Sequence, residues 1–214
     1  MLNKRQINQA MHIIIDMYPQ AGPSLNADNN FQYLIAVTLS AQTTDAAVNK
    51  VTEKLFSKYP TPDAMSKADI IDVEKIIHSI GLYHNKAKHA IACSKMLVND
   101  YQSVVPNKKS ELIKLPGVGV KTANVELGDC FGFPSFAVDT HVSKISKRLH
   151  FVKKDAKVGE IEKKITASLE PKYWIHGHHA MIELGRAYNF HDEKQIENLP
   201  VVIQCDKWNK KINA

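Results

Sequence analysis

The pattern of apolar and polar positions is helical along nearly the whole chain. In residues 2–18, apolar side chains recur three and four positions apart, as on one face of an amphipathic helix. The same spacing, bounded by prolines and capping residues such as Asp28 or Asn29 and Thr44, continues further on. No segment alternates convincingly as a strand, so the sequence predicts an all-α fold with short loops. The expected later helices span residues 29–40, 44–59, 62–67, 69–78, 86–101, 138–149, 157–169 and 173–189.

Residues 115–125, Leu-Pro-Gly-Val-Gly-Val-Lys-Thr-Ala-Asn-Val, interrupt this pattern with a tight turn. Pro116 ends a helix expected over residues 110–115, and the two glycines that follow allow unusual backbone angles and a close backbone approach. A new helix then begins near Val120 with its N–H groups and positive dipole end exposed, which favours an anion such as phosphate. The candidate backbone contacts to nucleic acid are Gly117, Val118 and Gly119. The alternative is a plain corner between two helices.

Two side chains near this turn could carry chemistry. Lys121 offers an amine that could act as a nucleophile on a nucleic acid, and the helix dipole together with partial burial would favour its uncharged form. Asp139, in Ala-Val-Asp-Thr-His-Val, offers a carboxylate that could stabilise a positive charge or accept a proton. The structural alternatives are a lysine that contacts phosphate and an aspartate that caps the helix after it.

Composition narrows the class of partner. The chain has 214 residues, a net charge of +6 and a pI of about 9.1, which favours a polyanionic partner. Only three of its 28 basic residues are arginine, so lysine contacts to phosphate are expected to outweigh bidentate reading of guanine. The three cysteines are widely spaced and suggest neither disulfides nor a zinc site. Residues 1–18 lack the apolar core of a signal peptide, so a cytoplasmic location is expected.

The string Leu-Pro-Gly-Val-Gly-x-Lys-Thr-Ala, taken with Asp139, resembles the helix–hairpin–helix of the DNA glycosylase superfamily, and the bacterial endonuclease III family in particular. Residues 39–45 (Leu-Ser-Ala-Gln-Thr-Thr-Asp) and 81–86 (Gly-Leu-Tyr-His-Asn-Lys) match further family segments in the same order. The resemblance covers about residues 2–190. It implies a bacterial, nucleoid-associated enzyme that removes oxidised pyrimidines from DNA and cleaves 3′ to the abasic site by β-elimination, through a Schiff base on Lys121.

The resemblance also implies how the chain is organised and which further residues meet DNA. A six-helix barrel would span residues 23–134, with the helix–hairpin–helix at about 108–130, and a second helical domain would join residues 1–22 to 135–214 across a cleft. Further residues are expected in these roles: Gln42 and Leu82 filling the space left by an extruded base, His141 touching the DNA backbone, and Asp45 near the lesion pocket. Alternatively, His141 could be packed within the protein or solvated, and the Asp45 carboxylate could serve only to complement the positive end of its helix dipole.

The sequence departs from the family pattern near its C-terminus. The family carries four cysteines, spaced C-x6-C-x2-C-x5-C, that hold an iron–sulfur cluster. The matching positions here are Asn189, Ile196, Leu199 and Cys205. We therefore expect no cluster, and we expect residues 190–214 to be ordered by packing of Leu199, Val201, Val202, Ile203 and Trp208.

Other expectations concern cofactors, partners and rival functions. No metal or organic cofactor is expected for the chemistry, although the resemblance allows a monovalent cation at the hairpin carbonyls. Zinc at His176-Gly-His-His179 is disfavoured, because adjacent histidines on a helix point in different directions. Val120 stands where the family usually has a basic residue. The expected partner is double-stranded DNA with a damaged or abasic nucleotide, bound by a monomer. The rivals are a monofunctional mismatch glycosylase and a non-catalytic DNA-binding module.

Overall fold

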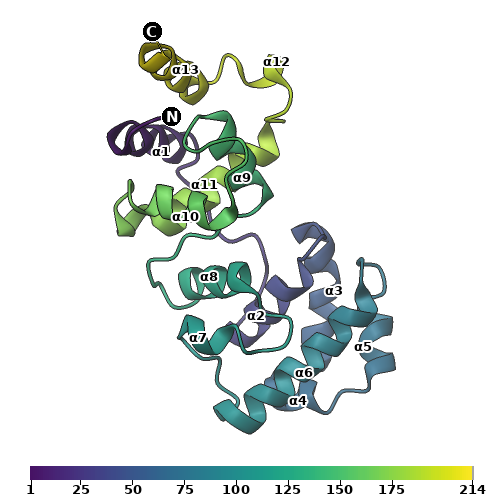
Figure 1. The fold of residues 1–214 in the computed structure, drawn as a ribbon. Coiled ribbons are helices and arrows are strands. Elements are labelled where there is room, and N and C mark those ends of the chain that lie inside the picture. The colour runs from purple at the N-terminus through teal and green to yellow at the C-terminus, as the bar shows by residue number, and fades with distance from the viewer. Residues whose placement is uncertain (214) are drawn as a thin grey trace. The chain divides into compact units, whose positions relative to one another are not determined.

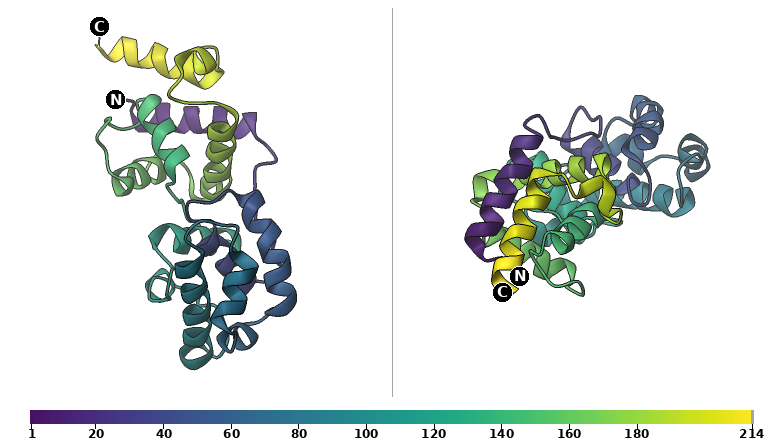
Figure 2. Two further views of the ribbon diagram at one scale, coloured as in Figure 1. Left: turned by 90° about the vertical axis from the view of Figure 1, so that its right-hand side faces the viewer. Right: turned by 90° about the horizontal axis from the view of Figure 1, so that it is seen from above.

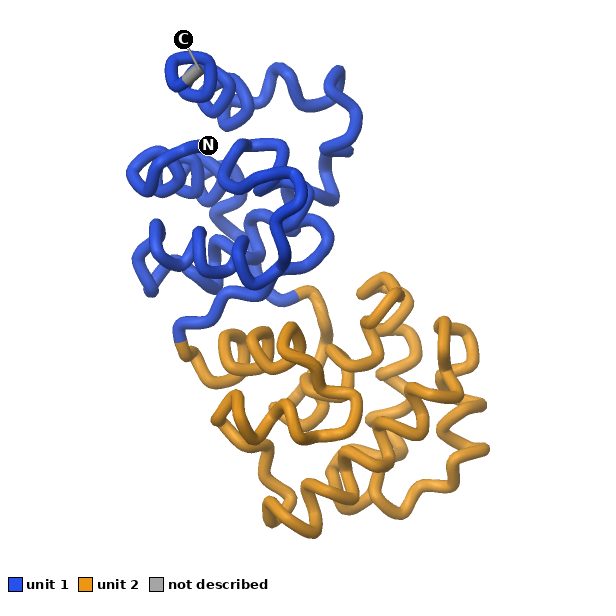
Figure 3. Tube along the Cα trace, in the orientation of Figure 1, with its two compact units in different colours: residues 1–23, 134–214 blue, residues 24–133 orange. Residues whose placement is uncertain are grey.

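The computed structural model describes residues 1–213, and the regular elements in that range are all helices (Figure 1). The chain divides into two compact units (Figure 3). One is Ser24–Phe133, here the central unit, and the other joins Met1–Pro23 to Pro134–Ala214, here the terminal unit. Ala214, the last residue of the second expected domain, lies outside the described residues.

The central unit is built around a helix that is buried on nearly every side. This helix, α2, contacts α3, α6 and α8, while α4 and α5 pack against α6 (Figure 1). Its N-cap Asn29 accepts a hydrogen bond from the Gln32 N–H, and Thr44 caps the next helix in the same way, so both sequence-predicted caps are confirmed. The elements are α2 (Asn30–Leu39), α3 (Asp45–Lys58), α4 (Pro62–Ser66), α5 (Ile70–Ile77), α6 (Tyr83–Tyr101), α7 (Lys109–Leu112) and α8 (Val120–Asp129).

The terminal unit brings the two ends of the chain together. Helix α11 packs against α1 and α9, and α1 also lies beside α13, as the views in Figure 2 show. Its core is formed by apolar side chains from each of these helices. The elements are α1 (Lys4–Met17), α9 (Thr140–Arg148), α10 (Val158–Thr166), the 3-10 helix η1 (Pro171–Tyr173), α11 (Trp174–Ala187), α12 (Glu193–Ile196) and α13 (Pro200–Asn213). Within the described residues, no helix is both long and apolar enough to cross a lipid bilayer.

Three local predictions differ from the structure. The helix expected over residues 110–115 is a single turn, α7, because the backbone already turns at Ile113. Helix α6 begins at Tyr83 rather than at residue 86, directly after a left-handed residue. The C-terminal residues form α12 and α13, which the sequence analysis missed. Leu199, Val201 and Val202 are buried as expected, but Ile203 is 53% exposed.

Candidate functional site

The two glycines of the hairpin turn differ in whether the fold itself requires a glycine. Gly117 has a φ of +81°, and a Cβ there would lie 2.9 Å from the Cβ of His89. Gly119 is the N-cap of α8 with a φ of −91°, and a Cβ there would meet nothing within 4 Å. The protein itself therefore requires a glycine at 117 but not at 119, where the space outside the backbone is open. Val118 is buried, so only its backbone could contact a ligand.

The N-terminus of α8 lacks the usual side-chain cap. Gly119 has no side chain to accept from the first N–H groups, so these donors remain available to a ligand. Val120 and Lys121 are the first two residues of the helix, and both are exposed. The sequence-based expectation that Lys121 is partly buried is wrong for this structure. The turn instead presents backbone donors and an amine to solvent.

Asp139 caps α9, as the sequence predicted. Its Oδ1 accepts a hydrogen bond from the Val142 N–H at 2.8 Å, and the side chain is only partly exposed. The cap bond fixes the carboxylate at the mouth of the helix and leaves Oδ2 outside that bond. The position is thus compatible with a chemical role in addition to the cap, and that role stays a prediction.

Gln42 and Leu82 share an unusual backbone conformation. Gln42, in the turn between α2 and α3, has a φ of 56°, and Leu82, before α6, has a φ of 60°. Both side chains are exposed, and Leu82 is 55% exposed despite being apolar. Left-handed backbone costs a residue with a side chain about 1–2 kcal/mol, and such strain gathers at functional sites. The geometry leaves both side chains free to enter a partner.

The remaining two candidates have structural explanations. Asp45 is the first residue of α3 and accepts a hydrogen bond from the Ser24 hydroxyl, which fits the dipole alternative. His141 packs against α11, because a Cβ on Gly185 would lie 2.5 Å from its Nδ1. The lesion-pocket and DNA-backbone roles of these two residues stay predictions.

The candidates divide between the two units. The hairpin turn, Lys121, Gln42, Asp45 and Leu82 belong to the central unit, whereas Asp139 and His141 belong to the terminal unit. The approach of Lys121 to Asp139 therefore stays a prediction.

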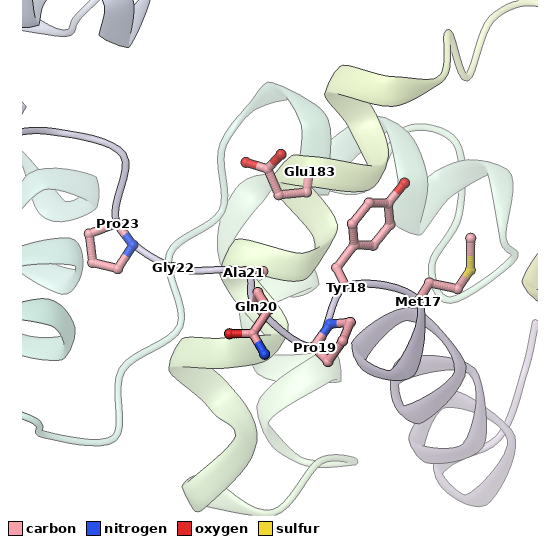
Figure 4. A pocket seen from close by; sticks show the side chains of 8 residues that line it. All are labelled: Met17, Tyr18, Pro19, Gln20, Ala21, Gly22, Pro23 and Glu183. Carbon is pink, nitrogen blue, oxygen red and sulfur yellow. The ribbon is translucent and has the colours of Figure 1, made fainter.

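A pocket in the terminal unit contains none of these residues. It is lined by residues 17–23 and by Glu183 of α11 (Figure 4). Burial raises the pKa of the Tyr18 phenol in its wall, and the nearby Tyr188 and Glu183 add to the effect.

A buried lysine and a buried glutamate were missed by the sequence analysis. Lys86 is 6% exposed, and its amine donates to the Thr43 hydroxyl at 2.8 Å, while burial lowers its pKa. Glu126 is fully buried in α8, and burial raises its pKa to about 8. A signal existed for Lys86, because it lies four residues before Ala90 and therefore on the same buried face of α6. Glu126 stands within an apolar run, next to Leu127, and was not singled out.

The C-terminal positions do not provide the donors of an iron–sulfur cluster. Ile196, Leu199 and Cys205 are buried in the apolar core of the terminal unit. The backbone N–H of Asn189 donates to Gln195, and its side chain accepts from the His191 N–H. In residues 1–213, no three histidine, cysteine or acidic side chains come together as a metal site. One thiol among aliphatic side chains does not fit a cluster that needs several thiolates.

An ion-pair network lies beside this apolar packing. Arg148 of α9 donates two hydrogen bonds to Asp206 of α13, at 2.9 and 3.0 Å, and also donates to Glu193 of α12. His150 lies 3.2 Å from the same Asp206 carboxylate. The network joins both C-terminal helices to α9.

Comparisons with known proteins agree with this arrangement. Residues 35–171 match the family model of the HhH-GPD superfamily base excision DNA repair protein. The chain is 41% identical to endonuclease III of Bacillus subtilis over 211 residues, covering 99% of this chain and 96% of that protein. It is 37% identical to endonuclease III of Escherichia coli K12 over 185 residues, covering 86% and 87%.

Solved structures of related proteins resemble this chain as well. A non-covalent endonuclease III–DNA complex superposes on the full length of both chains with a TM-score of 0.92 and 42% identity. A thermostable thymine-DNA glycosylase, at 19% identity, shares the fold with a TM-score of 0.83, covering 96% of this chain and 97% of that chain. The identities, the coverage and the matched hairpin together place this chain in the endonuclease III family of the HhH-GPD superfamily.

Proposed function

We propose that this protein is a base-excision repair enzyme, a DNA glycosylase with AP lyase activity that acts on oxidised pyrimidines. Membership of the endonuclease III family supports the activity. The observation that carries the assignment of the nucleophile is the exposed Lys121 amine in the first turn of α8, behind a turn with free backbone donors. Its partner is double-stranded DNA with a damaged or abasic nucleotide, in the nucleoid, bound by a monomer. A relative of known structure that it matches over the full length of both chains is itself a complex with DNA.

Binding begins at the phosphates. The N–H groups at the start of α8 and the open space outside Gly119 support a phosphate contact there, since the helix dipole favours an anion at this end. Gln42 and Leu82 then fill the space that the damaged nucleotide leaves in the DNA duplex. Bound DNA also covers the Lys121 amine and removes water from it.

The chemistry proceeds in two stages. The Lys121 nitrogen bonds to C1′ as the bond from C1′ to the base breaks, and the base leaves with the electron pair and a proton. The sugar ring opens to a Schiff base, which acidifies the C2′ proton. Loss of that proton breaks the bond between C3′ and its phosphate oxygen, and water then releases Lys121. Asp139 stabilises positive charge on the sugar and accepts a proton from the amine.

The experiment is borohydride trapping on duplex DNA that carries an abasic site. A covalent adduct that disappears in Lys121→Ala but persists in Lys95→Ala, an exposed lysine of α6, supports the assignment. Asp139→Asn should keep binding and lose most of the turnover. Adduct formation that persists in Lys121→Ala would remove Lys121 from the mechanism. Base removal without strand cleavage by the wild type would favour the monofunctional rival, and binding without either would favour the DNA-binding module.

We further propose that the protein carries no iron–sulfur cluster. The donor positions occupied by Asn189, Ile196 and Leu199 support this, as does the burial of Cys205 in apolar packing. Iron analysis and the visible absorption spectrum of protein purified without oxygen test it. One cluster per chain would overturn the proposal.

A further inference from the structure

Lys86 is bonded to two turns that are far apart in the sequence. Its backbone N–H donates to the Leu82 carbonyl at 3.0 Å, which closes the first turn of α6. Its side-chain amine donates to the Thr43 hydroxyl at 2.8 Å, and Thr43 directly follows Gln42. One residue therefore connects the turn that presents Leu82 to the turn that presents Gln42.

The cost of this arrangement indicates that the connection is strong. Lys86 is only 6% exposed, and a buried amine loses much of its hydration unless a partner replaces it. A hydrogen bond from a charged donor is stronger than one between neutral groups, so Thr43 compensates part of that loss. The two turns also need such a constraint, because the left-handed backbone at Gln42 and Leu82 persists only where surrounding contacts enforce it.

We propose that Lys86 is a positioning residue that fixes the spacing between Gln42 and Leu82. The inference rests on the proposed function, in which both side chains enter the duplex as the damaged nucleotide leaves. Two side chains carried by separate turns enter one gap efficiently only if their spacing is set before binding, since ordering them during binding would cost affinity. Lys86 sets that spacing through its backbone on one side and its amine on the other.

The test is a double-mutant cycle with Lys86→Met, which keeps the aliphatic stem, and Thr43→Val, which removes the hydroxyl. The first readout is the fluorescence of 2-aminopurine placed opposite a tetrahydrofuran abasic analogue, because insertion of side chains unstacks the probe. The second is single-turnover removal of thymine glycol from duplex DNA. The controls are Lys88→Met, an exposed lysine on the same helix, and Thr43→Ser, which keeps the hydroxyl.

Each single variant should reduce thymine glycol removal roughly tenfold, the effect of one charge-assisted hydrogen bond, and the double variant should be no worse than either. The fluorescence change should fall in parallel. Strand cleavage at a preformed abasic site should fall less, because a sugar without a base leaves the helix at lower cost. Both controls should behave as wild type. A general loss of stability would reduce base removal and strand cleavage alike, so it would not produce this difference between the two activities.

Additive losses in the double variant, or equal behaviour of Lys86→Met and Lys88→Met, would overturn the inference. If urea titration shows that Lys86→Met is not folded, the comparison of Thr43→Val with Thr43→Ser decides by itself whether the bond between Lys86 and Thr43 positions the two turns. If the wild type removes no base but still changes the fluorescence, the proposed catalysis fails while the fluorescence cycle still decides the role of Lys86.

Discussion

At the scale of single residues, the two glycines of the hairpin turn allow stability to be separated from DNA contact. Gly117→Ala forces a side chain into left-handed backbone and against the Cβ of His89, 2.9 Å away. We expect it to lower the free energy of unfolding by about 2 kcal/mol or more. Gly119→Ala meets no atom within 4 Å, so its cost should be limited to a poorer N-cap, about 0.5 kcal/mol.

Urea unfolding and DNA binding by the same two variants check this. Gly119→Ala should unfold at nearly the same urea concentration as the wild type, since only the N-cap becomes poorer. It should lose affinity for duplex DNA, because a methyl group would stand where phosphate approaches α8. Equal affinity of Gly119→Ala and wild type would show that DNA does not approach this backbone closely.

Glu126 should make stability fall as the pH rises. In the folded chain, burial raises its pKa to about 8 from the ordinary value of 4.5, and the nearby Asp129 adds to this, while the Cys130 thiol partly opposes it. Below pH 4.5 the carboxyl is protonated in both the folded and the unfolded chain. Between these values only the unfolded chain loses the proton, so folding weakens by up to about 1.4 kcal/mol per pH unit.

Glu126→Gln keeps the size of the side chain and removes its titration. We expect the variant to gain stability relative to wild type as the pH rises from 5 to 8, and to show no such gain near pH 4.5. The free energy of unfolding in urea, measured across this range, gives the slope directly. Glu53→Gln, at an exposed position of α3, is the control and should leave the slope unchanged. Parallel slopes for wild type and Glu126→Gln would contradict the prediction.

At the scale of elements, Arg148 holds the C-terminal helices. Its side chain is 19% exposed and bonds to Asp206 of α13 and Glu193 of α12. Arg148→Met would leave Asp206 partly buried without its main partner, and we expect a loss of about 2 kcal/mol. Amide hydrogen exchange should become faster in α12 and α13 before it does so elsewhere.

The pH response of the Arg148 network has the opposite sign to that of Glu126. The hydrogen bond from Arg148 lowers the pKa of Asp206 below its ordinary value of 3.8. The stabilisation that the ionised Asp206 contributes to the folded chain is therefore complete above that value, and it is lost as the pH falls through the pKa of Asp206 in the folded chain. Arg186→Met, which breaks a surface pair with Glu183, is the control and should cost little. Equal exchange rates in α13 of both variants would show that the apolar packing alone holds the helix.

Local chemistry in the sequence predicted most helices and several of their ends. The caps at Thr44 and Asp139 were predictable because each side chain accepts a hydrogen bond from the N–H three residues onward. The left-handed backbone at Leu82 was not, since leucine has no local preference for it. The bond between Lys86 and Thr43 joins residues 43 positions apart, which no periodic pattern reveals. Helix α13 was missed although Val201, Cys205 and Trp208 recur at helical spacing.

At the scale of the whole molecule, the proposed chemistry draws on both units. Lys121 and Asp139 were predicted from residue type and motif, but Lys121 belongs to the central unit and Asp139 to the terminal unit, so their cooperation stays a prediction. The net charge of +6 also acts over the whole molecule, and most of it is carried by lysine. Affinity for DNA should therefore fall steeply with salt.

Val120 offers a test of whether the hairpin or the overall charge governs binding. It is 53% exposed at the first position of α8, beside the proposed phosphate contact. Val120→Lys should add one phosphate contact, strengthen binding at low salt and steepen the slope of log affinity against log salt by about 0.9. Val158→Lys adds the same charge at the first position of α10, where Val158 is 54% exposed, and is the matched control. Fluorescence anisotropy with duplex DNA at several salt concentrations measures both slopes. If the two variants gain equally, net charge rather than the hairpin sets the affinity; a gain confined to Val120→Lys places a phosphate at the N-terminus of α8.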